Sequence, residues 1–323
     1  MPATPKTKKR PARRAAAPSA PSDWKLRRAG GLRILEAPSL LRLDWLVHGF
    51  STRSGGQSRI PESPEGKNSR EAVLNLGFSA WDERERVVAN RRRFFQSLAA
   101  ARMQPVTLRQ IHSDMIVRVD AEALAEAANP RQGDALITRD PGLLLIVQTA
   151  DCIPILLADT RQRAVAAIHS GWRGTAQRIA EKTLGRMRME FGTRPEDVVA
   201  AIGPGIGRCC YEVGHEVVAE FAAKFPGARD WFDGPFDALS GGDNDPNWLP
   251  WLTMRPPGHA PPPPRAMLDL FAANRAILES AGIPANNISA SGFCTASRID
   301  LFFSYRRERT TGRLMAAIGI QPK

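Results

Sequence analysis

The sequence predicts a fold that mixes strands with helices and joins several strands by short turns. Apolar runs at 143–147, 153–158 and 164–168 have the length of buried strands, and the polar segment 159–163 separates the last two. An amphipathic segment at 177–190 then carries apolar residues at helical spacing. Because antiparallel returns alternate with helices, the pattern argues against a doubly wound parallel sheet.

The same patterns predict further elements along the chain. Strands are expected within 32–47 and at 107–119, 136–138, 198–202, 288–292, 301–305 and 314–320; helices are expected at 82–101, 121–128, 212–224 and 268–281. The glycines of Ser54-Gly55-Gly56 predict a tight turn. Segment 226–265 is rich in Gly, Pro, Asp and Trp and lacks periodicity, which predicts an inserted surface segment. Its Trp248 and Trp251 are expected to pack on the body, with packing on a partner chain as the alternative.

The positive charge is concentrated at the N-terminus. The chain has a formal net charge of +12, and residues 1–28 hold nine basic residues and one acid, a net +8. This segment is too polar and proline-rich to fold, so we expect a disordered tail before a single domain at 29–323. Such a tail has the chemistry to bind nucleic-acid phosphates nonspecifically, and a plain solvated tail is the alternative.

Composition indicates a soluble protein of the cytoplasm. No window approaches the length of a transmembrane helix. The cysteines are Cys152, Cys209, Cys210 and Cys294, and the adjacent pair makes a poor disulfide framework. A reducing compartment is therefore expected.

Three potential metal ligands stand out. Cys152 falls between two predicted strands, His169 ends the next one, and His112 lies within the strand-like alternation at 107–119. Two histidines and one cysteine suit a tetrahedral zinc with one position left for water or substrate. Taken singly, a buried cysteine or histidine is more often a packing residue, so the set of three carries the prediction.

Two arginines are candidates for anion binding near this set. Arg173 lies in the small-residue turn before the predicted helix at 177–190, where free backbone N–H groups favour an anion. Arg53 precedes the Gly-Gly turn and is a candidate phosphate contact, with a plain surface role as the alternative.

The chain also resembles a known family. Eight segments, in order, resemble the motifs of the YfiH or laccase-domain proteins, also called multicopper polyphenol oxidases: HGFSTRSGG from His48, NLGFS from Asn75, RQIHSD, TADCIPILLAD, AAIHSGWRGT, AIGPGIGRCCYEVGHEV, LDLFAANRAIL and FFSYRRERTTGR. The resemblance covers about His48 to Ile320. It implies one α+β domain with two mixed β-sheets packed together and helices outside, and a zinc held by His112, Cys152 and His169. It also places Arg53 and Asn75 near the active site.

The implied activity is phosphorolysis of adenosine, inosine and methylthioadenosine, together with adenosine deamination. For phosphorolysis, Arg53 and Arg173 are the candidates to hold phosphate. For deamination, Asp151 is the candidate to relay protons beside an activated water.

Two other classes remain open. A copper oxidase of phenols needs several copper centres, whereas the chain has five histidines in all, so copper in place of zinc is the less favoured cofactor. A cysteine hydrolase acting on peptidoglycan precursors would use Cys152 as nucleophile with a histidine base. Zinc bound to the same thiolate would oppose that role.

Overall fold

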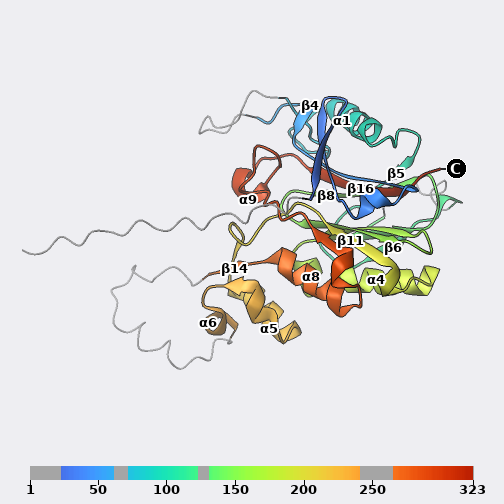
Figure 1. Cartoon of the computed structure of the whole chain (residues 1–323). Coiled ribbons are helices and arrows are strands. Elements are labelled where there is room, and N and C mark those ends of the chain that lie inside the picture. The colour runs from blue at the N-terminus through green and yellow to red at the C-terminus, as the bar shows by residue number, and fades with distance from the viewer. Residues whose placement is uncertain (1–22, 62–71, 123–130, 241–264, 323) are drawn as a thin grey trace, which may run out of the picture.

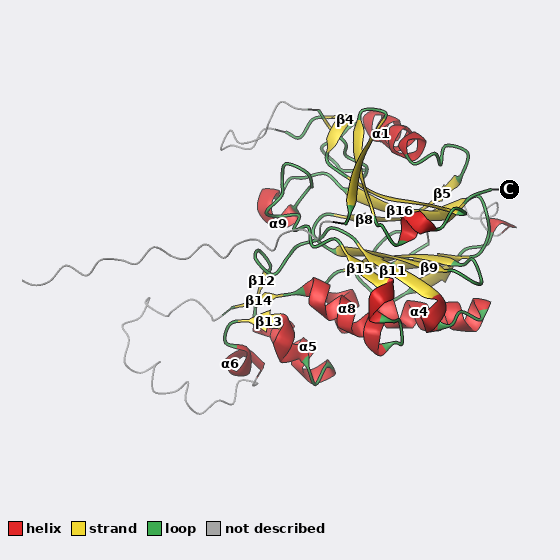
Figure 2. Cartoon of the chain, viewed as in Figure 1, coloured by secondary structure: helices red, strands yellow, loops and turns green. Residues whose placement is uncertain are grey.

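Two mixed sheets lie face to face with helices on their outer faces (Figure 1). The computed structural model describes residues 23–61, 72–122, 131–240 and 265–322. A small third sheet lies beside helices α5 and α6, away from α1 (Figure 2). The predicted α+β class is confirmed.

Within each sheet, neighbouring strands pair in the order in which they are named here, and this order differs from their order in the chain. The first sheet contains β1 (Lys25–Ala29), β2 (Leu32–Glu36), β3 (Leu46–Ser51), β16 (Leu314–Ile320), β8 (Leu143–Thr149) and β5 (Gln104–Val106). The second contains β15 (Ile288–Ala290), β11 (Val198–Ile202), β9 (Ile153–Asp159), β10 (Val165–Ser170), β7 (Ala135–Thr138) and β6 (Ile116–Arg118). The third contains β12 (Glu212–Val213), β14 (Ala266–Leu268) and β13 (Phe232–Asp233). Pairing is antiparallel except for β5 with β8, β6 with β7 and β15 with β11.

Helices complete the layers. The described α-helices are α1 (Arg84–Ser97), α3 (Trp172–Ala176), α4 (Ile179–Phe191), α5 (His215–Lys224), α6 (Phe236–Ser240), α8 (Leu270–Ser280) and α9 (Tyr305–Glu308). The short 3-10 turns are η1 (Leu40–Arg42), η2 (Pro195–Asp197), η3 (Ala228–Trp231) and η4 (Ala285–Asn287). Within the described ranges, no helix has the length and apolarity needed to cross a bilayer.

Strand β8 shows why the central strands are apolar along their whole length. Leu145 and Val147 belong to the cluster between the two sheets, while Leu144 and Ile146 pack with Phe94 of α1 on the outer face. Successive side chains of a strand point to opposite faces, so a strand covered on both sides needs a continuous apolar run. This pattern predicted β8, β9 and β10, and all three are confirmed.

Three local predictions are wrong. Segment 107–119 is a loop ending in β6, because His112 adopts a left-handed backbone with φ of 58°. Segment 54–56 belongs to β4 (Ser54–Ser58), where a side chain at Gly56 would come within 2.2 Å of the Val73 carbonyl oxygen, so the glycine permits close backbone approach. The run 301–305 leads into α9: Phe302 and Phe303 are buried between the sheets without strand pairing.

Other differences between the predicted and observed elements concern only where they begin. Glu212 and Val213 form β12, and the helix predicted from residue 212 begins at His215. Strand β1 begins at Lys25, ahead of the boundary expected at residue 29. Most of the helix predicted at 121–128 lies outside the described residues.

The predicted surface segment divides into two parts. Ala228, Phe232 and Leu239 are buried in the cluster beneath the second sheet, so the beginning of the segment is part of the fold. Trp248 and Trp251 lie outside the described residues, as does the rest of 241–264.

Candidate metal centre and its cavity

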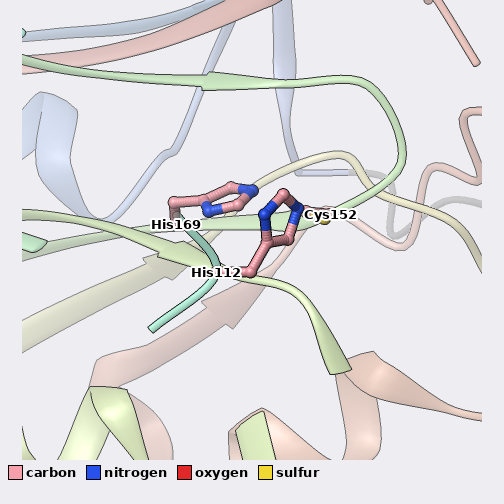
Figure 3. Close-up of side chains that lie close together, drawn as sticks. All are labelled: His112, Cys152 and His169. Atoms are coloured by element: carbon pink, nitrogen blue, oxygen red, sulfur yellow. The ribbon is translucent and has the colours of Figure 1, made fainter. Parts of the chain in front are cut away.

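Strand register brings two of the predicted ligands together. His169 pairs with Pro154 across β10 and β9, and Ser170 pairs with Ile153, so Cys152 lies directly beyond the strand end opposite His169. The loop before β6 supplies His112. One ligand atom from each of the three residues lies within 4.8 Å of the others (Figure 3).

The two imidazole rings lie edge to face. Their centroids are 4.9 Å apart with an interplanar angle of 78°. His169 is buried, Cys152 is half-buried and His112 is exposed. The three-residue ligand set is thus shielded from solvent at His169 and open to solvent at His112.

Asp134 positions both histidines. Its side chain is fully buried, and Oδ1 lies 2.9 Å from Nδ1 of His169 and 3.0 Å from the backbone N of His112. Oδ2 accepts hydrogen bonds from the backbone N–H groups of Ile111 and Ser113 and from the Ser113 hydroxyl. With Nδ1–H donated to a carboxylate, Nε2 of His169 carries the lone pair that a metal needs.

Electrostatics favours a cation at this set. Burial raises the pKa of the Cys152 thiol, but His169 and His112 outweigh it and hold the pKa below its ordinary value. Burial lowers the pKa of His169, but the charges of Cys152 and Asp134 outweigh it and raise the pKa overall. Burial also raises the pKa of Asp134, yet hydrogen bonds from His169 and Ser113 bring it down to about 2. The thiolate and the carboxylate therefore stabilise positive charge beside them, which is supplied by the His169 imidazolium or by a metal ion that takes the place of its Nε2 proton.

The backbone at Gly171 leaves room for the sulfur. A Cβ at this position would come within 2.9 Å of Cys152 Sγ and 3.5 Å of the His112 ring. Gly171 lies between β10 and α3, and the chain passes close to the ligand set at this residue. Any side chain here would compete for space with the thiolate.

The ligand set opens into a cavity of about 720 Å³. Its lining includes three arginines, Arg306, Arg309 and Arg313, and one acid, Asp151. The remaining lining residues are Leu108, Gln110, His112, Gln148, Thr149, Ala150, Cys152, His169, Ile206, Tyr211 and Tyr305. The cavity thus combines borderline metal donors with an excess of positive charge.

None of the three guanidinium groups is paired with a carboxylate in the described part of the chain. Arg306 donates to the Glu212 carbonyl and lies over the Tyr211 ring, Arg313 donates to the Gly312 carbonyl, and Arg309 lies over Tyr305. Their charge is available to an anion in the cavity.

Asp151 lines the cavity with both carboxylate oxygens engaged. Oδ1 accepts from the Thr295 hydroxyl at 2.7 Å, and Oδ2 accepts from the Arg306 backbone N–H at 2.6 Å. Its backbone has a φ of 95°, and its carbonyl accepts from the N–H of Ile206. Asp151 therefore joins the Cys152 loop to the segment that carries the arginines.

Arg53 and Asn75 lie outside the cavity lining and hold the surrounding chain. Arg53 Nη1 donates to the carbonyls of Ile299 and Phe302 and forms an ion pair with Glu308 at 2.9 Å. Asn75 is buried; its amide nitrogen donates to the Gly77 carbonyl and to Asp82, and its oxygen accepts from the Arg313 backbone N–H. Asn75 thus holds the backbone of Arg313, one of the cavity arginines, in place.

Arg173 also lies outside the cavity lining. Its guanidinium stacks on the Trp172 ring at 4.3 Å. The sequence predicts that Arg53 and Arg173 hold phosphate; their side chains lie outside this lining and contact other groups, and their role in anion binding stays a prediction.

Sequence reasoning missed Asp134 as a positioning residue and the three cavity arginines. Asp134 was visible only as the acid of the Gly-Asp-Ala-Leu-Ile-Thr segment, and the arginines as part of the Arg-rich motif after Phe303. The high density of arginines between residues 306 and 313 was the signal in the sequence that pointed to these three residues.

The donor set fits zinc. One thiolate and two imidazoles are the borderline ligands that Zn²⁺ takes, and three protein ligands leave a position facing the cavity. Atoms already within 4.8 Å of one another need only small side-chain movements to share one ion.

Fold and site together define a class of protein, an α+β scaffold with a candidate His-His-Cys metal set in an arginine-lined cavity. The family model described as "Multi-copper polyphenol oxidoreductase laccase" matches residues 47–321. The chain belongs to this family.

Relatives and solved structures agree with this placement. The chain is 37% identical over 293 residues to a Deinococcus radiodurans protein named purine nucleoside phosphorylase, covering 90% of this chain and 94% of that one. It is 33% identical over 266 residues to "Adenosine deaminase RL5" from an unknown prokaryotic organism, covering 81% and 88%. YlmD from Geobacillus stearothermophilus superposes with a TM-score of 0.71 at 32% identity, covering 94% and 100%. Bacillus licheniformis YfiH gives a TM-score of 0.74 at 27% identity, covering 93% and 100%.

Proposed function

We propose that this protein is a zinc-dependent purine nucleoside phosphorylase that converts adenosine, inosine and methylthioadenosine to the free base and ribose 1-phosphate. The observation that carries the proposal is the presence of Arg306, Arg309 and Arg313 in the same cavity as the His-His-Cys set. Relatives named purine nucleoside phosphorylase support the choice of reaction.

The arginines supply what a phosphate cosubstrate needs. Guanidinium groups bind phosphate through paired, charge-assisted hydrogen bonds. Among these lining residues Arg309 is exposed, while Arg306 and Arg313 are half-buried, so positive charge extends from the cavity to the solvent and attracts an anion. We favour these residues over Arg53 and Arg173, which remain candidates outside this lining.

In phosphorolysis, a phosphate oxygen forms a bond to C1′ of the ribose while the bond from C1′ to the purine nitrogen breaks. The electron pair leaves with the base, which then takes up a proton. Positive charge develops on the sugar, and an anion held by arginines beside C1′ stabilises it. A cavity of about 720 Å³ lies within the range that encloses ligands of this size.

Tyr211 adds a neutral polar group to the wall. Burial raises the pKa of its phenol, so the hydroxyl stays protonated at neutral pH and is able to donate a hydrogen bond to a base or a sugar oxygen. The Arg306 guanidinium over the ring, 5.2 Å from its centroid, fixes the orientation of this side chain.

Zinc would be held by Nε2 of His169, the Cys152 thiolate and the His112 ring. When bound, it supplies a Lewis acid at the base of the cavity and lowers the pKa of a water ligand. Asp134 keeps His169 in the required tautomer, and Gly171 keeps the space around the sulfur free.

Adenosine deamination is the second candidate activity. It is favoured by the same ligand set and by the relative named adenosine deaminase. Asp151 is adjacent to Cys152 and remains the candidate proton relay, although its two oxygens already hold Thr295 and the Arg306 backbone. Each carboxylate oxygen has a second lone pair, so Asp151 is able to accept a proton from an activated water while both hydrogen bonds persist.

The test is to incubate the zinc-loaded protein with adenosine, with and without phosphate, and to separate the products by chromatography. Adenine and ribose 1-phosphate that appear only with phosphate establish phosphorolysis, and inosine without phosphate establishes deamination. If neither forms while an amide or a phenol turns over, the purine assignment is wrong. A cysteine hydrolase or a copper oxidase then takes its place.

A further inference from the structure

Three of the four cysteines gather at a second place in the fold. Cys209 and Cys210 lie in the turn that follows Gly207, and Cys294 lies in the segment after β15. Their sulfur atoms are all within 4.8 Å of one another. None of the three lines the arginine-rich cavity.

The spacing suits a single ion. Three sulfurs that each lie about 2.3 Å from one metal are separated from one another by roughly 3.8–4.0 Å. The Cys209 and Cys210 sulfurs are 3.5 Å apart, and the set as a whole needs only a small adjustment to reach this spacing. All three are free thiols in the structure.

Gly207 provides a second, independent indication. Its backbone N–H donates to Cys294 Sγ at 3.2 Å, a bond that stabilises negative charge on sulfur. A Cβ at Gly207 would lie 3.1 Å from the Cys294 Cβ and 3.6 Å from Cys209 Sγ, so glycine allows the amide to approach the cluster. Backbone N–H groups directed at ligand sulfurs are typical outer-sphere partners of thiolate metal sites.

We propose that Cys209, Cys210 and Cys294 form a second metal site that binds a soft closed-shell cation, either Cu⁺ or Zn²⁺. Thiolate ligands select these ions over harder ones. Three sulfurs, with no imidazole or carboxylate joining the set within the described ranges, match three-coordinate Cu⁺ or a Zn²⁺ completed by water. Exposure increases from Cys294 through Cys210 to Cys209, which gives an ion a path in from solvent.

The site is linked to the cavity by two short segments. Gly205 pairs with Cys294, Thr295 donates its hydroxyl to Asp151, and Ile206 donates its backbone N–H to the Asp151 carbonyl. A bound ion would therefore tie together the two segments that hold Asp151 beside Cys152. We expect loading of this site to raise the thermal stability of the chain.

The test is native mass spectrometry of the full chain, loaded under reducing and anaerobic conditions with Zn²⁺ or with Cu⁺. The wild type should bind two ions, Cys209→Ser should bind one, and Cys152→Ser should bind one, so that each variant removes a different site. Cys209 is exposed, so this variant tests the site even if Cys294→Ser fails to fold. Equal ion counts in Cys209→Ser and the wild type would overturn the proposal.

Co²⁺ distinguishes the two sites by their sulfur content. Thiolate-to-metal charge-transfer absorption should be strong in Cys152→Ser, which retains the three-sulfur set, and weak in Cys209→Ser, which retains one sulfur in the first set. Competition with a chelator of each ion shows whether Cu⁺ or Zn²⁺ is retained. If the fully reduced wild type takes up no second ion of either kind, the metal proposal is wrong.

Discussion

Oδ1 of Asp134 lies 2.9 Å from Nδ1 of His169, and the same oxygen accepts the backbone N–H of His112 at 3.0 Å. One buried acid thereby sets the tautomer of one imidazole ligand and the loop position of the other. The left-handed backbone of His112, with a φ of 58°, is tolerated because the three N–H groups of 111–113 all converge on this carboxylate.

Replacing Asp134 with Asn should therefore weaken zinc binding by about 10- to 100-fold, the usual cost of losing an outer-sphere carboxylate. The carboxylate uses Oδ1 for His169 and His112 and Oδ2 for Ile111 and Ser113, whereas the amide has one acceptor oxygen and must place its NH2 group against one of these two sets. Competition with a chromophoric chelator measures the affinity. Asp159→Asn is the matched control, because Asp159 is equally buried but caps the turn at Arg161 and Gln162, at the opposite end of β9 from Cys152. An unchanged zinc affinity in Asp134→Asn would show that the carboxylate does not position the ligands.

Much of this centre was predictable because its ligands are anchored in strands. Cys152 and His169 flank a hairpin whose apolar runs are recognisable in the sequence, and the register of β9 and β10 then places them together. The position of His112 was not predictable in the same way. The alternation around it is that of a strand, and only hydrogen bonds to Asp134, more than twenty residues away in the chain, hold it in a loop.

The anion-binding side of the cavity was less predictable still. Arg53 has the sequence context of a phosphate contact, but a carboxylate partner, Glu308, and two carbonyls far away in the chain take up its guanidinium. Arg309 and Arg313 are not held in this way, and they follow a run that resembles a strand. Side-chain pairing over such separations depends on tertiary structure, which local patterns do not encode.

A methyl group at Gly171 should also weaken metal binding. Its Cβ would come within 2.9 Å of Cys152 Sγ, so Gly171→Ala must displace the thiolate or the start of α3. We expect a loss of zinc affinity and of the activity that depends on it. Gly185→Ala is the control: this glycine lies in α4 with nothing within 4 Å of a Cβ, and alanine there should be neutral or slightly stabilising. Full zinc content in Gly171→Ala would mean that the thiolate has more room than the structure shows.

Substitution of Arg309 or of Arg173 distinguishes between the two candidate phosphate sites. Arg309 lines the cavity and has no carboxylate partner among the described residues, whereas Arg173 stacks on Trp172 outside the cavity lining. Loss of a hydrogen bond to a charged group costs about 1.5–3 kcal/mol. Arg309→Ala should therefore raise the KM for phosphate roughly 10- to 100-fold and leave deamination almost unchanged, since water carries no charge to be held. Arg173→Ala should leave both reactions intact. The opposite ranking would return the phosphate site to the α3 turn.

Two N-terminal truncations should behave differently. Trp24 is buried against Phe50 with ring centroids 5.3 Å apart, and its indole N–H donates to the Ser289 hydroxyl. Removing residues 1–22 should leave turnover and melting temperature unchanged while it weakens any salt-sensitive binding to nucleic acid. Removing 1–28 should also destabilise the fold by about 3–5 kcal/mol, because it deletes this tryptophan and most of β1. Equal melting temperatures for the two truncations would show that β1 does not contribute to stability.

Stability should fall at mildly acidic pH because of His48. This residue is buried on β3, and its Nε2 accepts the backbone N–H of Ala37 at 3.1 Å. Burial lowers its pKa from the ordinary 6.5 to about 4. Between these values the unfolded chain takes up a proton that the folded chain excludes, so the stabilising contribution is complete above about pH 6.5 and is lost as the pH falls towards 4. A shift of this size corresponds to about 3 kcal/mol.

The measurement is denaturant unfolding of the wild type and His48→Gln at several pH values from 7 to 4. Glutamine offers a carbonyl oxygen to the Ala37 N–H but does not titrate, so the variant should lose less stability across this range, by about 3 kcal/mol. The control for the substitution itself is His215→Gln, which makes the same replacement at an exposed position at the start of α5 and leaves the hydrogen bond between His48 and Ala37 in place. The wild type and His48→Gln share every other titrating group, so the difference between their slopes isolates His48. Parallel pH curves for His48→Gln and the wild type would mean that His48 takes up its proton in the folded state as readily as in the unfolded one.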